Sequence, residues 1–153
     1  MVGNSRKKNS SLYQPQPWET KGDTKRWIRL YDDMIKSPAF LSLSPYAKLL
    51  YIYIKGKHKG VYNEIKDTVI FPYTQAAQFT GIRKGNIKKL IDELENFGFI
   101  KTSQVGGLYR VTNHYTLING WHDIDDKEAE VIKKRLKDNN AAKSTLPKGL
   151  PDG

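Results

Sequence analysis

Five small or apolar residues between positions 77 and 90 constrain the fold of this chain more than any other feature. They are Ala77, Gly81, Ile82, Ile87 and Leu90. Ala77 precedes Gly81 by four residues, so a small side chain falls where two helices would approach each other closely. Gly81 can adopt the left-handed backbone conformation that other residues avoid. The spacing therefore predicts two packed helices that meet at a sharp turn.

The ends of both helices can also be placed. Thr74 is positioned to cap a first helix over residues 75–80. A second helix is expected from about Arg83 to Phe97, where Gly98 would end it. Its apolar residues recur on one helical face: Ile87, Leu90, Ile91, Leu94 and Phe97. The pair has the spacing of a helix-turn-helix motif. An ordinary helical hairpin with a glycine turn is the alternative.

Short extended segments flank the two helices. Residues 69–71 alternate as a strand that Pro72 ends, and a second strand is expected to begin at Phe99. The sequence Val105-Gly106-Gly107 favours a tight hairpin turn, after which residues 108–112 and 115–117 would pair back. A strand, two helices and a β-hairpin make a winged helix-turn-helix, with the two glycines at the tip of the wing.

Upstream of this motif, residues 27–31 alternate well enough to predict a short strand. Asp32 or Ser37 could open a helical turn. Ser44-Pro45 is a strong helix start, because the hydroxyl can cap free N–H groups and proline fits the first turn. The helix that follows, from Pro45 to about Lys57, is apolar on almost every side, so it is expected to be largely buried.

The 153 residues suffice for one domain plus tails, and the fold class predicted is α+β with a single winged helix-turn-helix domain. We divide the chain into a flexible basic arm (1–26), the domain (27–122), a C-terminal helix (123–138) and a disordered tail (139–153). The C-terminal helix has only a thin apolar seam, made of Ala129, Val131, Ile132 and Leu136. It must dock on the domain, pair with a second copy or stay partly frayed. A homodimer is therefore a hypothesis.

The charge and the amino-acid composition limit the functions that this chain could have. The chain carries a net charge of +10, with a pI of about 9.7, and residues 123–153 contribute none of the excess. Such a balance predicts a polyanion as the partner, nucleic acid first.

The absence of cysteine excludes disulfides, Cys-ligated zinc and a thiol nucleophile. No apolar run approaches the roughly 18 residues of a membrane span, and residues 1–8 do not resemble a signal peptide, so a cytoplasmic protein is expected.

Enzymatic chemistry is not expected. His58, His114 and His122 do not lie at metal-ligand spacing on one helix, and no phosphate-binding loop of the GxxxxGK[ST] kind occurs. The adjacent pairs Asp32-Asp33 and Asp125-Asp126 are better interpreted as acids at helix N-termini than as paired catalytic carboxylates. We therefore predict no catalytic residue, no metal and no cofactor.

Residues 27–122 resemble the winged-helix domain of short helix-turn-helix proteins from plasmids, prophages and conjugative elements of Gram-positive bacteria. The N-terminal domains of replication initiators of that type are similar. The resemblance is carried by residues 41–51 (LSLSPYAKLLY), 73–82 (YTQAAQFTGI) and 90–100 (LIDELENFGFI). It implies DNA binding, but the same fold serves transcription, replication and conjugation alike.

The first turn of a recognition helix usually reaches deepest into the major groove. Arg83, Lys84 and Asn86 are expected near base edges or adjacent phosphates, with Lys88 and Lys89 close behind. A solvated basic helix face is the alternative, but residues 83–89 contain four basic side chains and no acid. Around the wing and in the arm, the candidate DNA-binding residues are Lys101, Gln104, Arg110, Lys25 and Arg26. For the wing residues, ordinary exposed hairpin charges are an equally good interpretation. For the two arm residues, a solubilising tail is slightly favoured over DNA contact.

The function predicted is sequence-specific binding of double-stranded DNA on a mobile genetic element. The protein would regulate transcription or assist at an origin of replication or transfer. The alternative is a winged helix that contacts replication or transfer proteins and binds DNA only non-specifically. RNA binding ranks lower, because the sequence offers no aromatic stacking platform on a sheet.

Overall fold

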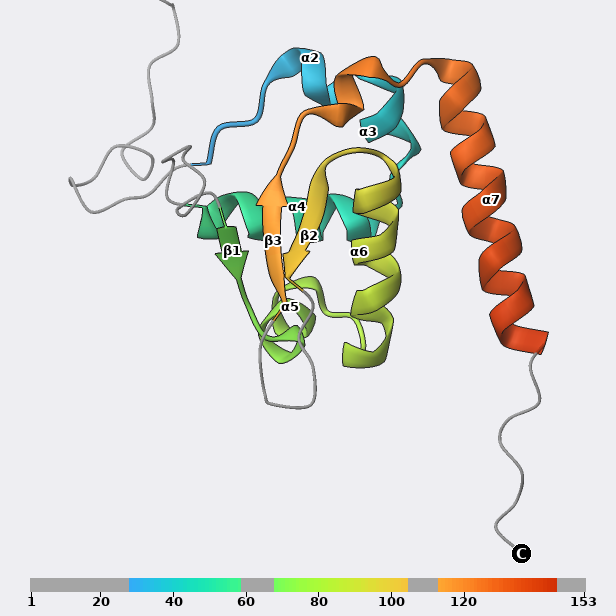
Figure 1. Ribbon diagram of the computed structural model, residues 1–153. Coiled ribbons are helices and arrows are strands. Elements are labelled where there is room, and N and C mark those ends of the chain that lie inside the picture. Colours follow the sequence, from blue (N-terminus) through green and yellow to red (C-terminus); the bar gives the residue numbers. More distant parts are fainter. Residues whose placement is uncertain (1–27, 59–67, 105–112, 146–153) are drawn as a thin grey trace, which may run out of the picture.

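The computed structural model describes residues 28–58, 68–104 and 113–145. Within these ranges the chain is an α+β protein, in which helices pack around a three-stranded antiparallel sheet (Figure 1). None of the described helices combines the length and apolar character needed to cross a membrane. The elements, in chain order, are α2 (Asp32–Ile35), α3 (Pro38–Ser42), α4 (Pro45–Lys57), β1 (Thr68–Ile70), α5 (Tyr73–Thr80), η1 (Lys84–Asn86), α6 (Ile87–Asn96), β2 (Ile100–Gln104), β3 (His114–Leu117), η2 (Gly120–Asp123) and α7 (Asp126–Thr145).

The starts of α3 and α4 follow the prediction. The Ser37 hydroxyl accepts a hydrogen bond from the Phe40 N–H at 3.1 Å, and Ser44 caps α4 in the same way. Helix α4 crosses behind the sheet in Figure 1 and buries Leu50 and Ile54 completely. The expectation of an almost wholly buried helix was too strong, because Tyr46 on its outer face is 48% exposed.

The strand predicted at residues 27–31 is wrong for the residues described. Ile28 to Tyr31 form no strand. Ile28 instead packs against the end of α4, where its Cδ1 atom lies 3.1 Å from the position that a Cβ on Gly56 would occupy. The apolar alternation of this segment therefore serves contact with a helix, and none of the three described strands pairs with it.

The sheet has the order β1-β3-β2, with both pairs antiparallel. The fully buried Tyr115 on β3 lies between Val69 of β1 and Thr102 of β2. Prediction placed the first strand one residue too late, since β1 ends at Ile70. The predicted hairpin turn at 105–107 and the strand at 108–112 lie outside the described residues.

The turn from α6 into β2 is held by a close approach of two backbones. Gly98 has a φ of 74°, and its carbonyl oxygen accepts a hydrogen bond from the Trp121 N–H at 3.0 Å. A Cβ at Gly98 would lie 2.6 Å from the carbonyl carbon of Gly120. The Phe99 ring stacks on Trp121 beside this contact. Glycine at position 98 therefore both ends α6, as predicted, and allows η2 to pack against that end.

Helix α7 docks on the domain, which was one of the three outcomes expected for the C-terminal segment. Ala129 and Ile132 are buried in the common core. Val131 was expected in the apolar seam, but it is 63% exposed. The helix also continues to Thr145, so residues 139–145 are helical and not part of a disordered tail. The docked seam ends near Leu136. The helix continues past Asp138, Asn139 and Asn140, which are weak helix formers, into the better helix formers Ala141, Ala142 and Lys143.

Candidate nucleic-acid interface

The turn between α5 and α6 has the predicted geometry. Gly81 adopts the left-handed conformation with a φ of 72°, and its N–H donates to the Ala77 carbonyl at 2.9 Å. The following Ile82 packs against the core, and Ile87 is fully buried. The fully buried small residue of α5 is Ala76, one position before the predicted Ala77, which is only partly buried.

Two helix starts differ from the prediction. Helix α5 begins at Tyr73, after Pro72, and not at Gln75 behind a Thr74 cap. Arg83 is extended, with φ −60° and ψ 138°, and residues 84–86 form a short 3-10 turn before α6. The turn contains Gly85, which has a low α-helix propensity. Arg83 and Lys84 therefore project from a tight turn ahead of α6.

The predicted basic residues are gathered at this turn and on the first turn of α6. Their side chains are exposed: Arg83, Lys84, Lys88 and Lys89. Lys88 forms an ion pair with Asp92, and this hydrogen bond raises the pKa of Lys88 and keeps it charged. Within the described residues, the other three side chains have no ion pair. Asn86 is half-buried, and its side chain makes no capping hydrogen bond to α6.

Two acidic residues of α6, Glu93 and Glu95, bond to other parts of the domain, a role that sequence reasoning missed. Glu93 accepts hydrogen bonds from the N–H and the hydroxyl of Ser44, at 2.5 and 2.9 Å. Glu95 accepts from the N–H of Thr102 at 2.7 Å and also from its hydroxyl. These carboxylates tie α6 to α4 and β2. At the N-terminal end of α6, Arg83, Lys84 and Lys89 consequently have no paired acid among the described residues.

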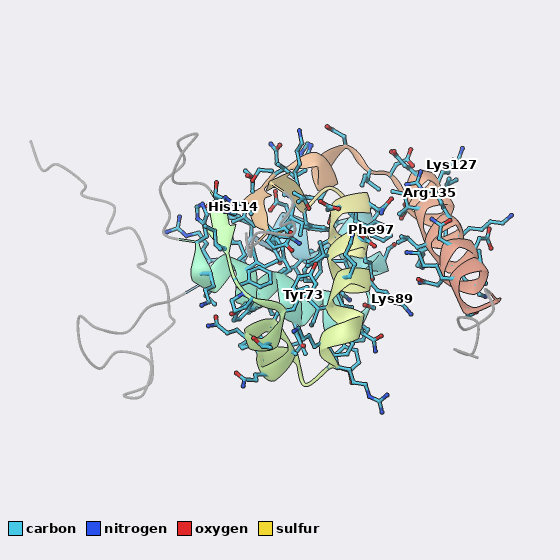
Figure 2. All side chains as sticks on the ribbon, turned by 60° about the horizontal axis from the view of Figure 1, so that its bottom comes forward. Tyr73, Lys89, Phe97, His114, Lys127 and Arg135 are labelled. Atoms are coloured by element: carbon cyan, nitrogen blue, oxygen red, sulfur yellow. The ribbon has the colours of Figure 1, made fainter. Side chains whose placement is uncertain are left out.

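A hydrogen-bonded group lies beside this basic end, at the base of the segment 105–112. The Asn113 side-chain amide donates to the hydroxyls of Tyr73 and Tyr115, at 3.2 and 3.0 Å. Burial raises the pKa of the Tyr115 hydroxyl, and its hydrogen bond with Tyr73 adds to the shift. Tyr73 and Lys89 lie toward the same end of the domain in Figure 2. The group anchors β3 to the start of α5.

The remaining candidates are only partly placed. Lys101 is exposed on β2. Gln104 ends that strand opposite His114, but its side chain lies outside the described part of the structure. Arg110, Lys25 and Arg26 lie outside the described residues, as does the whole predicted arm. The structure therefore gathers the residues around α6 and places Lys101 on β2, whereas Arg110 and the two arm residues lie outside the described part.

The described part of the chain offers no site for a metal ion, since no three His, Asp or Glu side chains are clustered in it. A groove with a volume of about 420 Å³ separates α6 from α7.

Comparisons with protein-family models, with curated proteins and with solved structures found no match to this chain.

Proposed function

We propose that this protein binds double-stranded DNA in a sequence-specific manner, with the turn before α6 and the first turn of α6 in the major groove. The order of elements supports a winged helix-turn-helix. A strand precedes two helices joined at Gly81, and two antiparallel strands follow them. The segment 105–112, between β2 and β3, has the position of the wing.

The separation of charge along α6 is the observation that carries the proposal. Four basic side chains are exposed over residues 83–89, whereas all three acids of α6 are engaged in hydrogen bonds or an ion pair. Cations at a helix N-terminus are unfavourable, because the helix dipole places positive charge there. A phosphate backbone would offset that cost.

Base recognition is assigned to Arg83, Lys84 and Asn86. An arginine can bind guanine with two parallel hydrogen bonds, and an asparagine can bind adenine in the same way. The amide of Asn86 is not used for capping α6, so it is available to a base edge. A Cβ at Gly85 would have no neighbouring atom within 4 Å, which leaves space for close approach of the duplex.

The biological setting follows from the resemblance to proteins of mobile elements. The protein would act there as a transcriptional regulator or as an origin-binding accessory in replication or transfer, in the cytoplasm and without catalytic activity of its own. Two copies would meet successive major grooves if the protein is a homodimer.

A second candidate function is supported by exposed apolar side chains on α4 and α5. Tyr46 and Leu49 lie on one face of α4 and are 48% and 39% exposed. Phe79 of α5 is 50% exposed, and its ring packs on Tyr53 of α4, with 5.1 Å between ring centres. Such a surface fits a protein partner, for example in a replication or transfer complex. DNA binding would then be only non-specific.

Substitutions at the base-reading positions distinguish the two functions. Sequence-specific binding predicts that Arg83→Ala or Asn86→Ala lowers affinity for a preferred site by roughly 5- to 150-fold, the cost of about 1–3 kcal/mol for a lost base contact. Affinity for random duplex would change much less with Asn86→Ala, because that residue carries no charge. Uniform weakening on every duplex would favour the interaction module. Lys36→Ala, at the C-cap of the distant α2, is the control.

A further inference from the structure

The groove between α6 and α7 has one wall from each helix. Figure 1 shows the two helices side by side and running in opposite directions, so the end of α7 lies toward the start of α6. They are joined near the other end, where Arg135 donates a hydrogen bond to the side-chain oxygen of Asn96 at 2.8 Å. The α7 wall includes Lys133 and Lys137, which are four positions apart, and Lys143, which lies six positions further along the helix. Lys133 and Lys137 share one face of the helix, and Lys143 lies about a third of a turn around the helix from Lys137.

The charge of the groove is positive. Lys89 of α6 faces the three lysines of α7 across it. Two acids also line the groove, but Glu93 is held by Ser44, and Asp92 is paired with Lys88. Lys133 is paired with Glu130 at 3.2 Å. Among the described residues, Lys89, Lys137 and Lys143 have no ion pair, so they are available to an anion from outside the chain.

The groove is too large for a single small anion. Its volume of about 420 Å³ corresponds to roughly 14 water molecules at about 30 Å³ each. Lys137 and Lys143 are separated by about 9 Å along α7, at 1.5 Å per residue. That is the axial rise of two to three nucleotides of one strand, at about 3.4 Å each. The two lysines could therefore meet two different phosphates of a strand.

We propose that this groove seats the sugar–phosphate backbone of one strand of the bound duplex, with α6 on one side and α7 on the other. Lys89, Lys137 and Lys143 would bind its phosphates. The proposal rests on the proposed DNA binding and extends its surface to a second element. Lys89 belongs to both surfaces, so the groove is continuous with the basic end of α6.

The sign of the charge also argues against the opposite role for α7. A helix that masked a DNA-binding surface would be expected to present acids to its lysines. Helix α7 presents lysines to Lys89 instead. Lys89 and the α7 lysines repel one another, and an anion between them would relieve that repulsion.

The test measures binding of the full chain to a fluorescein-labelled duplex of random sequence, about 30 base pairs long, by anisotropy across a salt series. The double variant Lys137→Gln/Lys143→Gln is compared with Lys127→Gln/Lys134→Gln. The control pair removes the same charge from the same helix, but its two lysines do not line the groove. Thermal unfolding is measured for both variants to check that they remain folded.

Loss of two phosphate contacts lowers the slope of log K against log salt by about 1.8. The affinity ratio of wild type to the groove variant therefore changes roughly 12-fold between about 50 and 200 mM salt. The control pair is expected to leave the slope nearly unchanged. Equal effects of the two pairs would overturn the proposal, and tighter binding by the groove variant would show that α7 masks the site.

A third variant, Arg83→Gln/Lys84→Gln, keeps the two claims separable. If it weakens binding while the groove variant binds as wild type does, the groove proposal alone is wrong. If the wild type shows no salt-dependent affinity for duplex DNA, the proposed function is wrong, and the groove proposal is wrong with it.

Discussion

Replacing Gly98 with alanine would disturb the contact that fixes the end of α6. The new Cβ would lie 2.6 Å from the Gly120 carbonyl carbon and 2.6 Å from the Trp121 nitrogen. Both are backbone atoms, so the clash cannot be relieved by rotating a side chain. Segment η2 would have to move, which would strain the hydrogen bond from the Trp121 N–H to the Gly98 carbonyl.

Gly81 provides a matched control for the size of the effect. Its φ of 72° is close to the 74° of Gly98, but no atom lies within 4 Å of its Cβ position. Alanine at Gly81 should therefore cost only the left-handed conformation, about 1–2 kcal/mol. Alanine at Gly98 should cost that amount, plus about 0.5–1.5 kcal/mol for the hydrogen bond and a further loss from displaced packing. We expect about 1.5–3.5 kcal/mol before that packing loss is added.

Urea and thermal unfolding would measure both variants. For a chain of this size, 1 kcal/mol shifts the melting temperature by about 2–4 °C. Gly81→Ala should therefore lower the melting temperature by about 2–8 °C. Gly98→Ala should lower it by about 3–14 °C before the packing loss is added, so the Gly98 loss should be the larger of the two. Equal losses in the two variants would refute the close packing of Gly98 against η2.

Three further predictions concern α6 and the sheet. Glu93→Ala should cost about 1–3 kcal/mol of unfolding free energy, because it leaves the part-buried donors of Ser44 without their acceptor. Glu130→Ala, at an exposed position, is the control and should cost less than about 1 kcal/mol. Similar costs for the two variants in urea unfolding would contradict the role of Glu93. Gly85→Ala should leave stability nearly unchanged, because nothing lies within 4 Å of its Cβ position. The same substitution should weaken specific DNA binding by roughly tenfold, or about 1.4 kcal/mol. An unchanged affinity in anisotropy measurements would show that Gly85 does not approach DNA. Because the pKa of Tyr115 is raised in the folded protein, the unfolded chain loses the Tyr115 proton first as pH rises. Stability should therefore fall above about pH 10, by at most about 1.4 kcal/mol per pH unit. Tyr115→Phe should flatten that decline, and an unaltered decline in chemical denaturation would contradict the raised pKa of Tyr115.

The parts of the fold that depend on local spacing could be predicted from the sequence. The buried face of α6 follows from a 3.6-residue period, and the turn at Gly81 follows from one residue type. Local rules were less accurate at helix ends. Helix α6 begins at Ile87, after a short 3-10 turn that contains Gly85, and not at Arg83 as predicted. The continuation of α7 to Thr145 was not predicted, because no apolar seam follows Leu136 in the sequence.

The parts of the site that depend on distant residues could not be predicted. Glu93 and Ser44 are 49 positions apart in the sequence, and Asn113 and Tyr73 are 40 apart. Nothing in the charge pattern indicates such pairs. The groove was hidden for a similar reason, because residues 123–153 carry no net charge as a segment. Only folding places Lys137 and Lys143 on the side that faces Lys89.

Selection from a pool of random duplexes, followed by sequencing, tests the central claim most directly, since the target site need not be chosen in advance. Sequence-specific binding predicts that one motif is enriched and that the wild type prefers it to random duplex by about 10³-fold or more. The double variant Arg83→Ala/Asn86→Ala should lose that preference while remaining folded. Enrichment of no motif, with equal and steeply salt-dependent affinity for every duplex, would contradict the claim.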